Sequence, residues 1–132
     1  MRGCWSTVVT LSILLLGLGS LSCGESTKPR FDHEIRVERL RFFPNDISIG
    51  PGSRVRFVNV ERRGSDTIRT VTSGTGPMDP ERGNLFDEVL EGFDAGNVDG
   101  DDFLYDFDER GTFTYYTRFP EGEEFTGTIR VQ

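Results

Sequence analysis

From His33 onward, apolar and polar residues alternate along most of the chain. A period of two is typical of β-strands that bury one face. The clearest example is the segment 110–131, which predicts a strand, a tight loop and a closing strand. The first strand ends at Pro120, because proline cannot donate a hydrogen bond to a sheet. In the first strand Phe113, Tyr115, Thr117 and Phe119 alternate with Thr112, Thr114, Tyr116 and Arg118, and in the second Ile129 and Val131 share one face. In a further segment, residues 54–60, we expect Val55 and Phe57 to face inward.

Shorter segments of the same kind lie upstream at spacings of about ten residues, as in a β-sandwich. They cover residues 33–42, 47–49, 54–60, 67–73 and 103–107. In the first of them the apolar parity slips between Val37 and Leu40, which indicates a bulge or a change of sheet. Turn signals occupy residues 43–46 and 50–53.

Three polar stretches separate these strands. Residues 61–66 form a charged loop that we expect to be exposed, residues 74–83 form a loop rich in glycine and proline, and residues 92–102 form an acidic insertion. The only helical element that we expect is a single turn near residues 87–90. The pattern as a whole predicts an all-β fold.

The first part of the chain has the features of an export signal. Arg2 precedes an apolar run, Val8 to Leu18, that is too short to span a bilayer. Ser20-Leu21-Ser22-Cys23-Gly24 resembles a bacterial lipobox, in which the cysteine becomes the lipidated N-terminus. An ordinary signal peptidase could cut the same bond, and a retained membrane anchor is a third alternative.

We therefore divide the chain into a signal peptide (1–22), a lipid-attachment cysteine with a polar tether (23–30) and one folded domain (31–132). We expect the mature protein to lie in the periplasm or on the outer cell surface, anchored to the membrane through a lipid on Cys23. The domain is long enough to bury a core.

Charge and cysteine content exclude several functions. With 15 Lys plus Arg against 22 Asp plus Glu, the chain has a net charge of −7, which argues against nucleic acid or an anionic membrane surface as a partner. Cys4 and Cys23 are the only cysteines. The folded domain therefore has no internal disulfide and no thiolate to offer to a metal.

Several short motifs together resemble the cupredoxins, the small blue-copper proteins of the plastocyanin and halocyanin type. The C-terminal hairpin carries the family frame as Gly111-Thr112-Phe113, Tyr115-Tyr116 and Thr126-Gly127-Thr128-Ile129. The run 43–59 resembles the family's N-terminal half, and Leu85-Phe86-Asp87 resembles its Phe-Asp segment. The resemblance covers about residues 42–131 and implies a Greek-key β-sandwich of about seven or eight strands. It also implies copper binding and electron transfer.

The copper ligands of that family are not present at the matching positions. Arg69 stands where the first His would be, Thr117 where the Cys would be, Phe119 where the second His would be, and Phe125 or Glu124 in the region of the Met. A type 1 copper centre needs two imidazoles and a thiolate. The chain has one histidine, His33, which lies outside every matching motif and reads as a plain surface residue. We therefore predict no cofactor.

Arg69 places a fixed cation where the copper cation would sit. One hypothesis is that it pairs with Glu123 or Glu124 of the closing loop and so replaces the metal electrostatically. The alternative is that Arg69 reaches solvent. The same end of the domain could form a contact surface, made of Arg69, Arg118, Phe119, Pro120, Glu123, Glu124 and Phe125. Alternatively, the two phenylalanines fill the space that the copper and its ligands vacated.

The acidic insertion could bind a hard cation. Its candidates are Asp94, Asn97, Asp99, Asp101 and Asp102, but their spacing fails the EF-hand pattern, because Ala95 would occupy the first ligand position. A solvated turn is the simpler interpretation. Thr117 and Ser73 lack a partnering histidine, so nucleophilic catalysis has no support, and we do not expect an enzyme.

The sequence thus predicts a non-catalytic binding or assembly module of the cell envelope, with an unknown envelope protein as its partner. The alternative is a copper-binding electron-transfer protein with unorthodox ligands, for which His33, Met78 and the acidic insertion are the available donors. A third possibility is a small-molecule sensor or an accessory domain of a larger partner.

Overall fold

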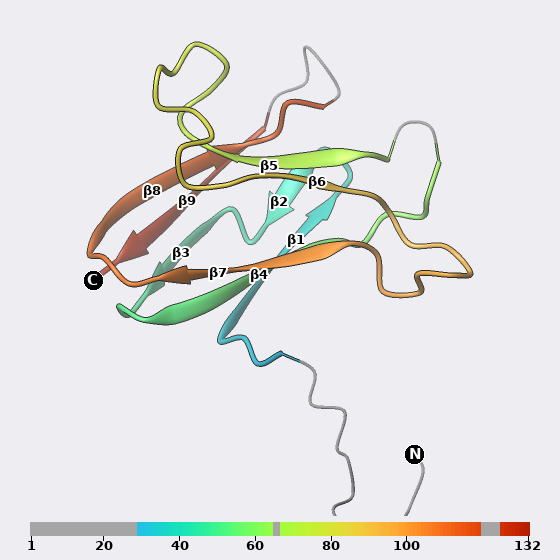
Figure 1. The fold of residues 1–132 in the computed structure, drawn as a ribbon, viewed down its shortest axis with the longest axis horizontal. Coiled ribbons are helices and arrows are strands. Elements are labelled where there is room, and N and C mark those ends of the chain that lie inside the picture. The colour runs from blue at the N-terminus through green and yellow to red at the C-terminus, as the bar shows by residue number, and fades with distance from the viewer. Residues whose placement is uncertain (1–28, 65–66, 120–124) are drawn as a thin grey trace, which may run out of the picture.

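The computed structural model describes residues 29–64, 67–119 and 125–132, which form an all-β domain (Figure 1). Within these residues no helix is present, so none is long and apolar enough to cross a lipid bilayer. The strands are β1 (His33–Glu38), β2 (Arg41–Phe43), β3 (Asp46–Ile49), β4 (Ser53–Asn59), β5 (Arg69–Ser73), β6 (Asp87–Leu90), β7 (Asp102–Phe107), β8 (Gly111–Tyr116) and β9 (Thr126–Val131).

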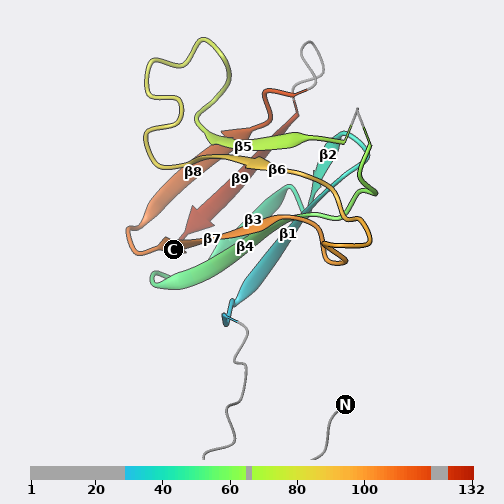
Figure 2. The same cartoon turned by 45° about the vertical axis from the view of Figure 1, so that its right-hand side comes forward.

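The nine strands form two sheets that pack face to face (Figures 1 and 2). One sheet has the order β2-β1-β4-β7 and the other the order β3-β9-β8-β5-β6. The pairs β1–β4 and β3–β9 are parallel, and all other pairs within the sheets are antiparallel. Most connections cross from one sheet to the other, as in a Greek-key sandwich. The predicted β-sandwich is confirmed, with nine strands rather than seven or eight.

The parity slip between Val37 and Leu40 is neither a bulge nor a change of sheet but a hairpin turn between two strands of one sheet. Arg39 and Leu40 both have positive φ (44° and 59°), and Glu38 pairs with Arg41 across the turn. This is the geometry of a two-residue turn that matches the twist of its strands. The turn ends β1 and starts β2, which is why Phe42 is buried although its parity differs from that of Val37.

The helical turn expected near residues 87–90 is wrong. These residues form β6, an edge strand that pairs antiparallel with β5, with Val89 opposite Thr70. Pairing with the buried strand β5 outweighs the weak local preference of a four-residue segment. The strand predicted to reach Pro120 ends earlier, at Tyr116. One more backbone bond crosses the hairpin, from the N–H of Thr117 to the carbonyl of Phe125 (3.1 Å), and the N–H groups of Arg118 and Phe119 then bond to the hydroxyls of Thr70 and Thr117 instead of a strand.

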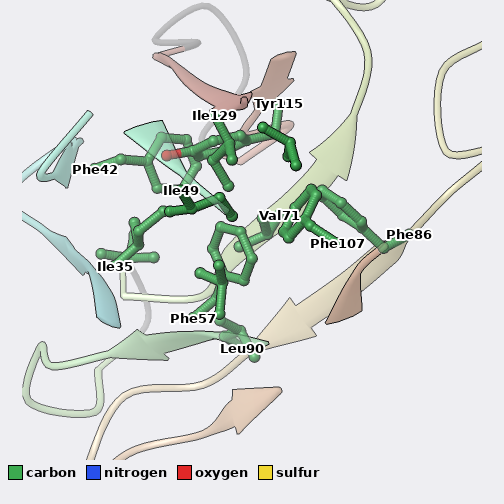
Figure 3. Close-up of a cluster of buried hydrophobic side chains, with 13 residues drawn as sticks. Ile35, Phe42, Ile49, Phe57, Val71, Phe86, Leu90, Phe107, Tyr115 and Ile129 are labelled. Carbon is green, nitrogen blue, oxygen red and sulfur yellow. The ribbon is translucent and has the colours of Figure 1, made fainter. Parts of the chain in front are cut away.

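The core between the sheets combines aromatic rings with isoleucine, valine and leucine side chains (Figure 3). The ring of Phe57 lies 5.3 Å from that of Tyr115 and 4.9 Å from that of Phe103, and Phe42 also meets Tyr115 edge to face at 4.7 Å. Such pairs stabilise a core beyond their buried area. The predicted inward positions Val55 and Phe57 are buried. Of the alternating residues in the C-terminal hairpin, Tyr115, Ile129 and Val131 are buried, Phe113 is half-buried and Phe119 is exposed.

Gly127 has a packing role opposite Tyr115. The two residues are cross-strand partners, and a Cβ at Gly127 would lie 2.2 Å from both Cζ and the hydroxyl oxygen of Tyr115. The tyrosine ring therefore lies directly over the glycine backbone. Burial raises the pKa of Tyr115 well above its ordinary value, and the nearby Asp46 charge adds to the shift.

Candidate functional site

Arg69, at the position of the family's first copper ligand, is the first residue of β5 and is only 5% exposed. Its Nη2 lies 2.7 Å from Oε2 of Glu61, and its Nη1 donates to the carbonyl of Ile68 (2.9 Å). The interpretation that Arg69 reaches solvent is therefore wrong. The proposed partners Glu123 and Glu124 lie outside the described residues, and Glu61 is the carboxylate that the described structure pairs with this guanidinium.

Glu61 was expected in an exposed loop, but its side chain is only 12% exposed. The backbone explains this position. The N–H of Glu61 donates to Oδ1 of Asn59 (3.0 Å), and its carbonyl accepts from the N–H of Phe93 (2.7 Å). One carboxylate oxygen also accepts from the N–H of Arg39 in the β1–β2 turn. Glu61 thus joins that turn, the 92–100 loop and β5.

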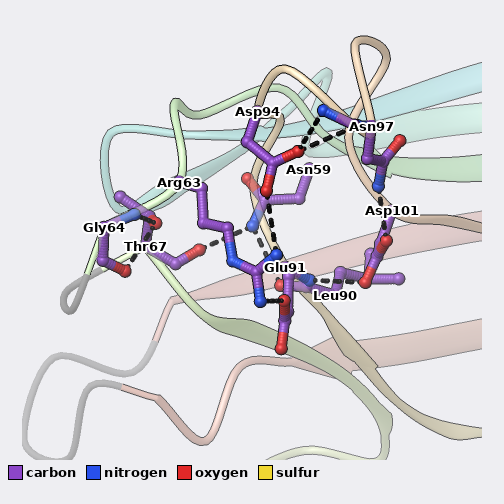
Figure 4. A network of polar contacts seen from close by, with 10 residues as sticks. Asn59, Arg63, Gly64, Thr67, Leu90, Glu91, Asp94, Asn97 and Asp101 are labelled. Carbon is purple, nitrogen blue, oxygen red and sulfur yellow. Dashed lines mark hydrogen bonds and ion pairs between the residues drawn. The ribbon is translucent and has the colours of Figure 1, made fainter.

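Asn59 is a buried organising residue that sequence reasoning missed (Figure 4). Its Nδ2 donates to the carbonyls of Thr67 (2.7 Å) and Leu90 (2.9 Å), which fixes the β4–β5 connection to the end of β6. The sequence carried one signal for this role, a polar residue at the end of the apolar strand β4. A buried amide needs hydrogen-bond partners, so its position indicated that Asn59 binds neighbouring segments.

Thr117, at the position of the family's cysteine ligand, is fully buried and fully bonded. Its hydroxyl donates to the carbonyl of Phe119 (2.8 Å) and lies 3.4 Å from the N–H of Thr70. The hydroxyl of Thr70 in turn accepts from the N–H of Arg118 (2.6 Å). Thr117 thus contacts Thr70, and Thr70 follows Arg69 directly in β5. The fold therefore places Arg69 and Thr117, the positions of the first two copper ligands, close to one another.

The two phenylalanines behave differently. Phe125 packs its ring 4.7 Å from that of Phe42 and joins the core, whereas Phe119 is 44% exposed. Beside Phe119, the Arg118 guanidinium pairs with Asp87 (2.8 Å), which also accepts from Thr72. Pro120, the remaining member of the predicted contact surface, lies outside the described residues together with Glu123 and Glu124.

The residues at the four ligand positions do not fit a type 1 copper ion. They offer a guanidinium, a hydroxyl and two phenyl rings, whereas that centre requires two imidazoles and a thiolate. His33 lies at the start of β1, and Met78 is 94% exposed in the β5–β6 connection. Among the described residues, no three His, Cys, Asp or Glu side chains come together in a way that could hold a metal ion.

The acidic insertion is an ordered polar network (Figure 4). Asp94 accepts from the N–H groups of Gly96 (2.7 Å) and Asn97 (2.9 Å) and from the Arg63 guanidinium (2.9 Å). The hydrogen bond from Arg63 and the two backbone donors lower the pKa of Asp94. Asp101 instead binds Asn97 and the N–H of Glu91.

The carboxylates of the insertion therefore do not converge on one point. Asp102 belongs to β7 and pairs with Arg56 of β4 (2.6 Å), away from Asp94 and its partners. Their oxygens are used by donors of the protein itself. This arrangement explains the acidic composition of the insertion as a loop-stabilising network.

Comparison with family models finds no match, and comparison with curated proteins finds none either. Solved structures do match. A purple cupredoxin from Nitrosopumilus maritimus aligns at 20% identity and a TM-score of 0.58, over 76% of this chain and 100% of its own. Amicyanin from Paracoccus versutus aligns at 19% identity and a TM-score of 0.56, over 80% and 85%.

A copper-containing nitrite reductase from Thermus scotoductus SA-01 aligns at 19% identity and a TM-score of 0.57, over 85% of this chain and 25% of its own. At these identities the likeness concerns the fold alone. The chemistry of the site has to be argued from the residues of this chain. The chain folds as a cupredoxin-like β-sandwich.

Proposed function

We propose that this chain is an exported, non-catalytic binding module that keeps the cupredoxin-like fold without a type 1 copper site. The observation that carries the proposal is the structural use of two ligand positions: Arg69 is ion-paired with Glu61, and the Thr117 hydroxyl is bonded to backbone groups. Both side chains thus make contacts inside the domain at the end of the sandwich where the copper ion of the family would lie.

The contact surface of this module is the end that carries Arg118 and Phe119. Phe119 presents an apolar ring, and the Arg118–Asp87 pair beside it supplies charged groups at the rim. An exposed aromatic residue bordered by charges is the composition of many protein contact sites. The partner in this proposal is another envelope protein, and Pro120, Glu123 and Glu124 would extend the same surface.

A non-catalytic role is supported by the state of the hydroxyl groups. Ser73 Oγ accepts from the N–H groups of Leu85 (3.1 Å) and Phe86 (3.3 Å), and Thr117 is bonded as described. Neither hydroxyl lies beside a histidine, which a serine- or threonine-type nucleophile would need. These groups hold loops in place.

Attachment to the membrane through Cys23 is part of the proposal. Mass spectrometry of the protein extracted from membranes should detect an acylated Cys23 at the N-terminus. The variant Cys23→Ala should appear in the soluble fraction. A protein cut before residue 23 but not acylated would reject the anchor while leaving export intact.

Metal analysis of the purified domain tests the central claim. Cu(II) is added to the domain and the excess metal is removed. We expect metal analysis to find less than one copper per chain, and the visible spectrum to show no intense band. Stoichiometric copper with a strong band would overturn the proposal and restore electron transfer.

The alternative, copper binding through unorthodox ligands, is favoured by the likeness to copper proteins such as the nitrite reductase. It would need His33, Met78 or the acidic insertion as donors. If copper binds, the variants His33→Ala and Met78→Leu identify the donors, and a contribution from either residue would support this alternative.

A further inference from the structure

A second candidate site lies between the β1–β2 turn and the β4–β5 connection. It is an open pocket of about 670 Å³. This volume is in the range of small-molecule sites. Its lining is polar and consists of Glu38, Arg39, Val60, Glu61, Arg62, Thr67 and Arg69.

The backbone under the arginines is fixed. The left-handed turn holds Arg39, whose N–H is bonded to the Glu61 carboxylate. Arg62 forms a parallel bridge with Phe93, flanked by bonds from Phe93 N–H to Glu61 and from Arg63 N–H to Phe93 (2.7 and 2.8 Å). A non-glycine turn with two positive φ angles persists only where its surroundings enforce it.

The charges of the pocket do not cancel. Its two carboxylates already have partners, since Glu38 pairs with Arg41 (3.1 Å) and Glu61 with Arg69 (2.7 Å). The guanidinium groups of Arg39 and Arg62 have no carboxylate within ion-pair distance among the described residues. Most other described arginines do, namely Arg41, Arg54, Arg56, Arg63, Arg69, Arg118 and Arg130.

We infer that this pocket binds a small oxyanion, a carboxylate or a phosphate group, between Arg39 and Arg62. A guanidinium matches the two oxygens of either group with parallel N–H donors, and two such forks on a fixed backbone can hold one ligand. The Arg69–Glu61 pair forms the buried side of the pocket and is neutral as a pair, so Arg39 and Arg62 supply the positive charge that an oxyanion would meet. The inference does not depend on the proposed contact surface around Phe119.

Isothermal titration calorimetry at low ionic strength tests this site with two probes, succinate and inorganic phosphate, in separate titrations. We expect at least one probe to bind with one-to-one stoichiometry. Arg39→Gln and Arg62→Gln should each weaken binding about tenfold, which corresponds to the loss of a charge-assisted hydrogen bond.

Arg110→Gln is the matched control, because it removes the same charge from an exposed position outside the pocket. Arg62→Lys keeps the positive charge but removes the planar pair of N–H donors. Its affinity should lie between those of the parent protein and Arg62→Gln. The preferred probe assigns the ligand as carboxylate or phosphate. Binding that is absent for both probes, or that Arg110→Gln weakens as much as Arg62→Gln, would overturn the inference.

Discussion

The Arg69 guanidinium lies 2.7 Å from the Glu61 carboxylate, and both side chains are largely withdrawn from solvent. Removing one partner of such a pair leaves the other charge buried and uncompensated. We therefore expect Arg69→Met to lower the free energy of unfolding by about 3–5 kcal/mol, measured by urea denaturation.

The double variant Arg69→Met/Glu61→Leu should recover most of that loss, because no charge is then left buried. Arg130→Ala is the control: its pair with Asp46 is exposed, and its loss should change stability by about 1 kcal/mol at most. If Arg69→Met behaved like Arg130→Ala, the pair would have no structural role.

Asn59→Leu should be more harmful than an ordinary polar-to-apolar change. It would leave the carbonyls of Thr67 and Leu90 and the N–H of Glu61 without their partner. At about 1–3 kcal/mol for each buried polar group left unbonded, a loss above about 3 kcal/mol is expected. Hydrogen exchange should show faster opening at Thr67–Arg69 in particular, and a uniform change across the domain would contradict this account.

Gly127→Ala should introduce a clash with Tyr115. The added methyl would lie 2.2 Å from the tyrosine ring, which other core rings hold in place. Overpacking of this kind destabilises by about 1–3 kcal/mol or more. Gly50→Ala, where the added methyl meets nothing within 4 Å, is the control and should have little effect. Equal melting temperatures for the two variants would exclude the proposed role of Gly127.

Acid should destabilise the domain through its bonded aspartates. Hydrogen bonds from Arg63 lower the pKa of Asp94, and those from Arg54 lower the pKa of Asp106. A lowered native pKa means that the unfolded chain binds more protons, so this stability is present above the unfolded pKa of about 3.9 and is lost as pH falls through the native value.

Asp94→Asn should therefore flatten the decline of unfolding free energy between about pH 5 and pH 2. Asp108→Asn, which removes the same charge from the β7–β8 turn, is the matched control. Parallel pH profiles for the parent and Asp94→Asn would show that the Arg63 contact contributes nothing to the acid response.

Alternation alone located most of the strands and the inward face of β4, because Val55 and Phe57 of that strand pack on the core. It could not locate β6, whose sequence Asp-Glu-Val-Leu has little β character and becomes a strand only by pairing with β5. The hairpin at Arg39 and Leu40 was equally hidden, since neither residue is among the glycines and asparagines that usually mark left-handed turns.

The residues at the ligand positions were predictable, but their partners were not. The missing imidazole and thiolate at Arg69 and Thr117 follow from residue identity. The pairing of Arg69 with Glu61 depends on a loop that was expected to face solvent, and that loop is drawn inward by Asn59 and Phe93. Local sequence carries no signal for such long-range bonds.

The parallel pairing of β1 with β4 has a mechanical consequence. β1 is held on both sides, by β2 and by β4, and it begins directly after the N-terminal segment. Tension applied at Phe31 along the strand axis would have to shear the whole β1–β4 ladder at once rather than unzip it one bond at a time. If the domain is tethered through Cys23 as proposed, it should therefore stay folded under pulling forces that would peel away a terminal edge strand.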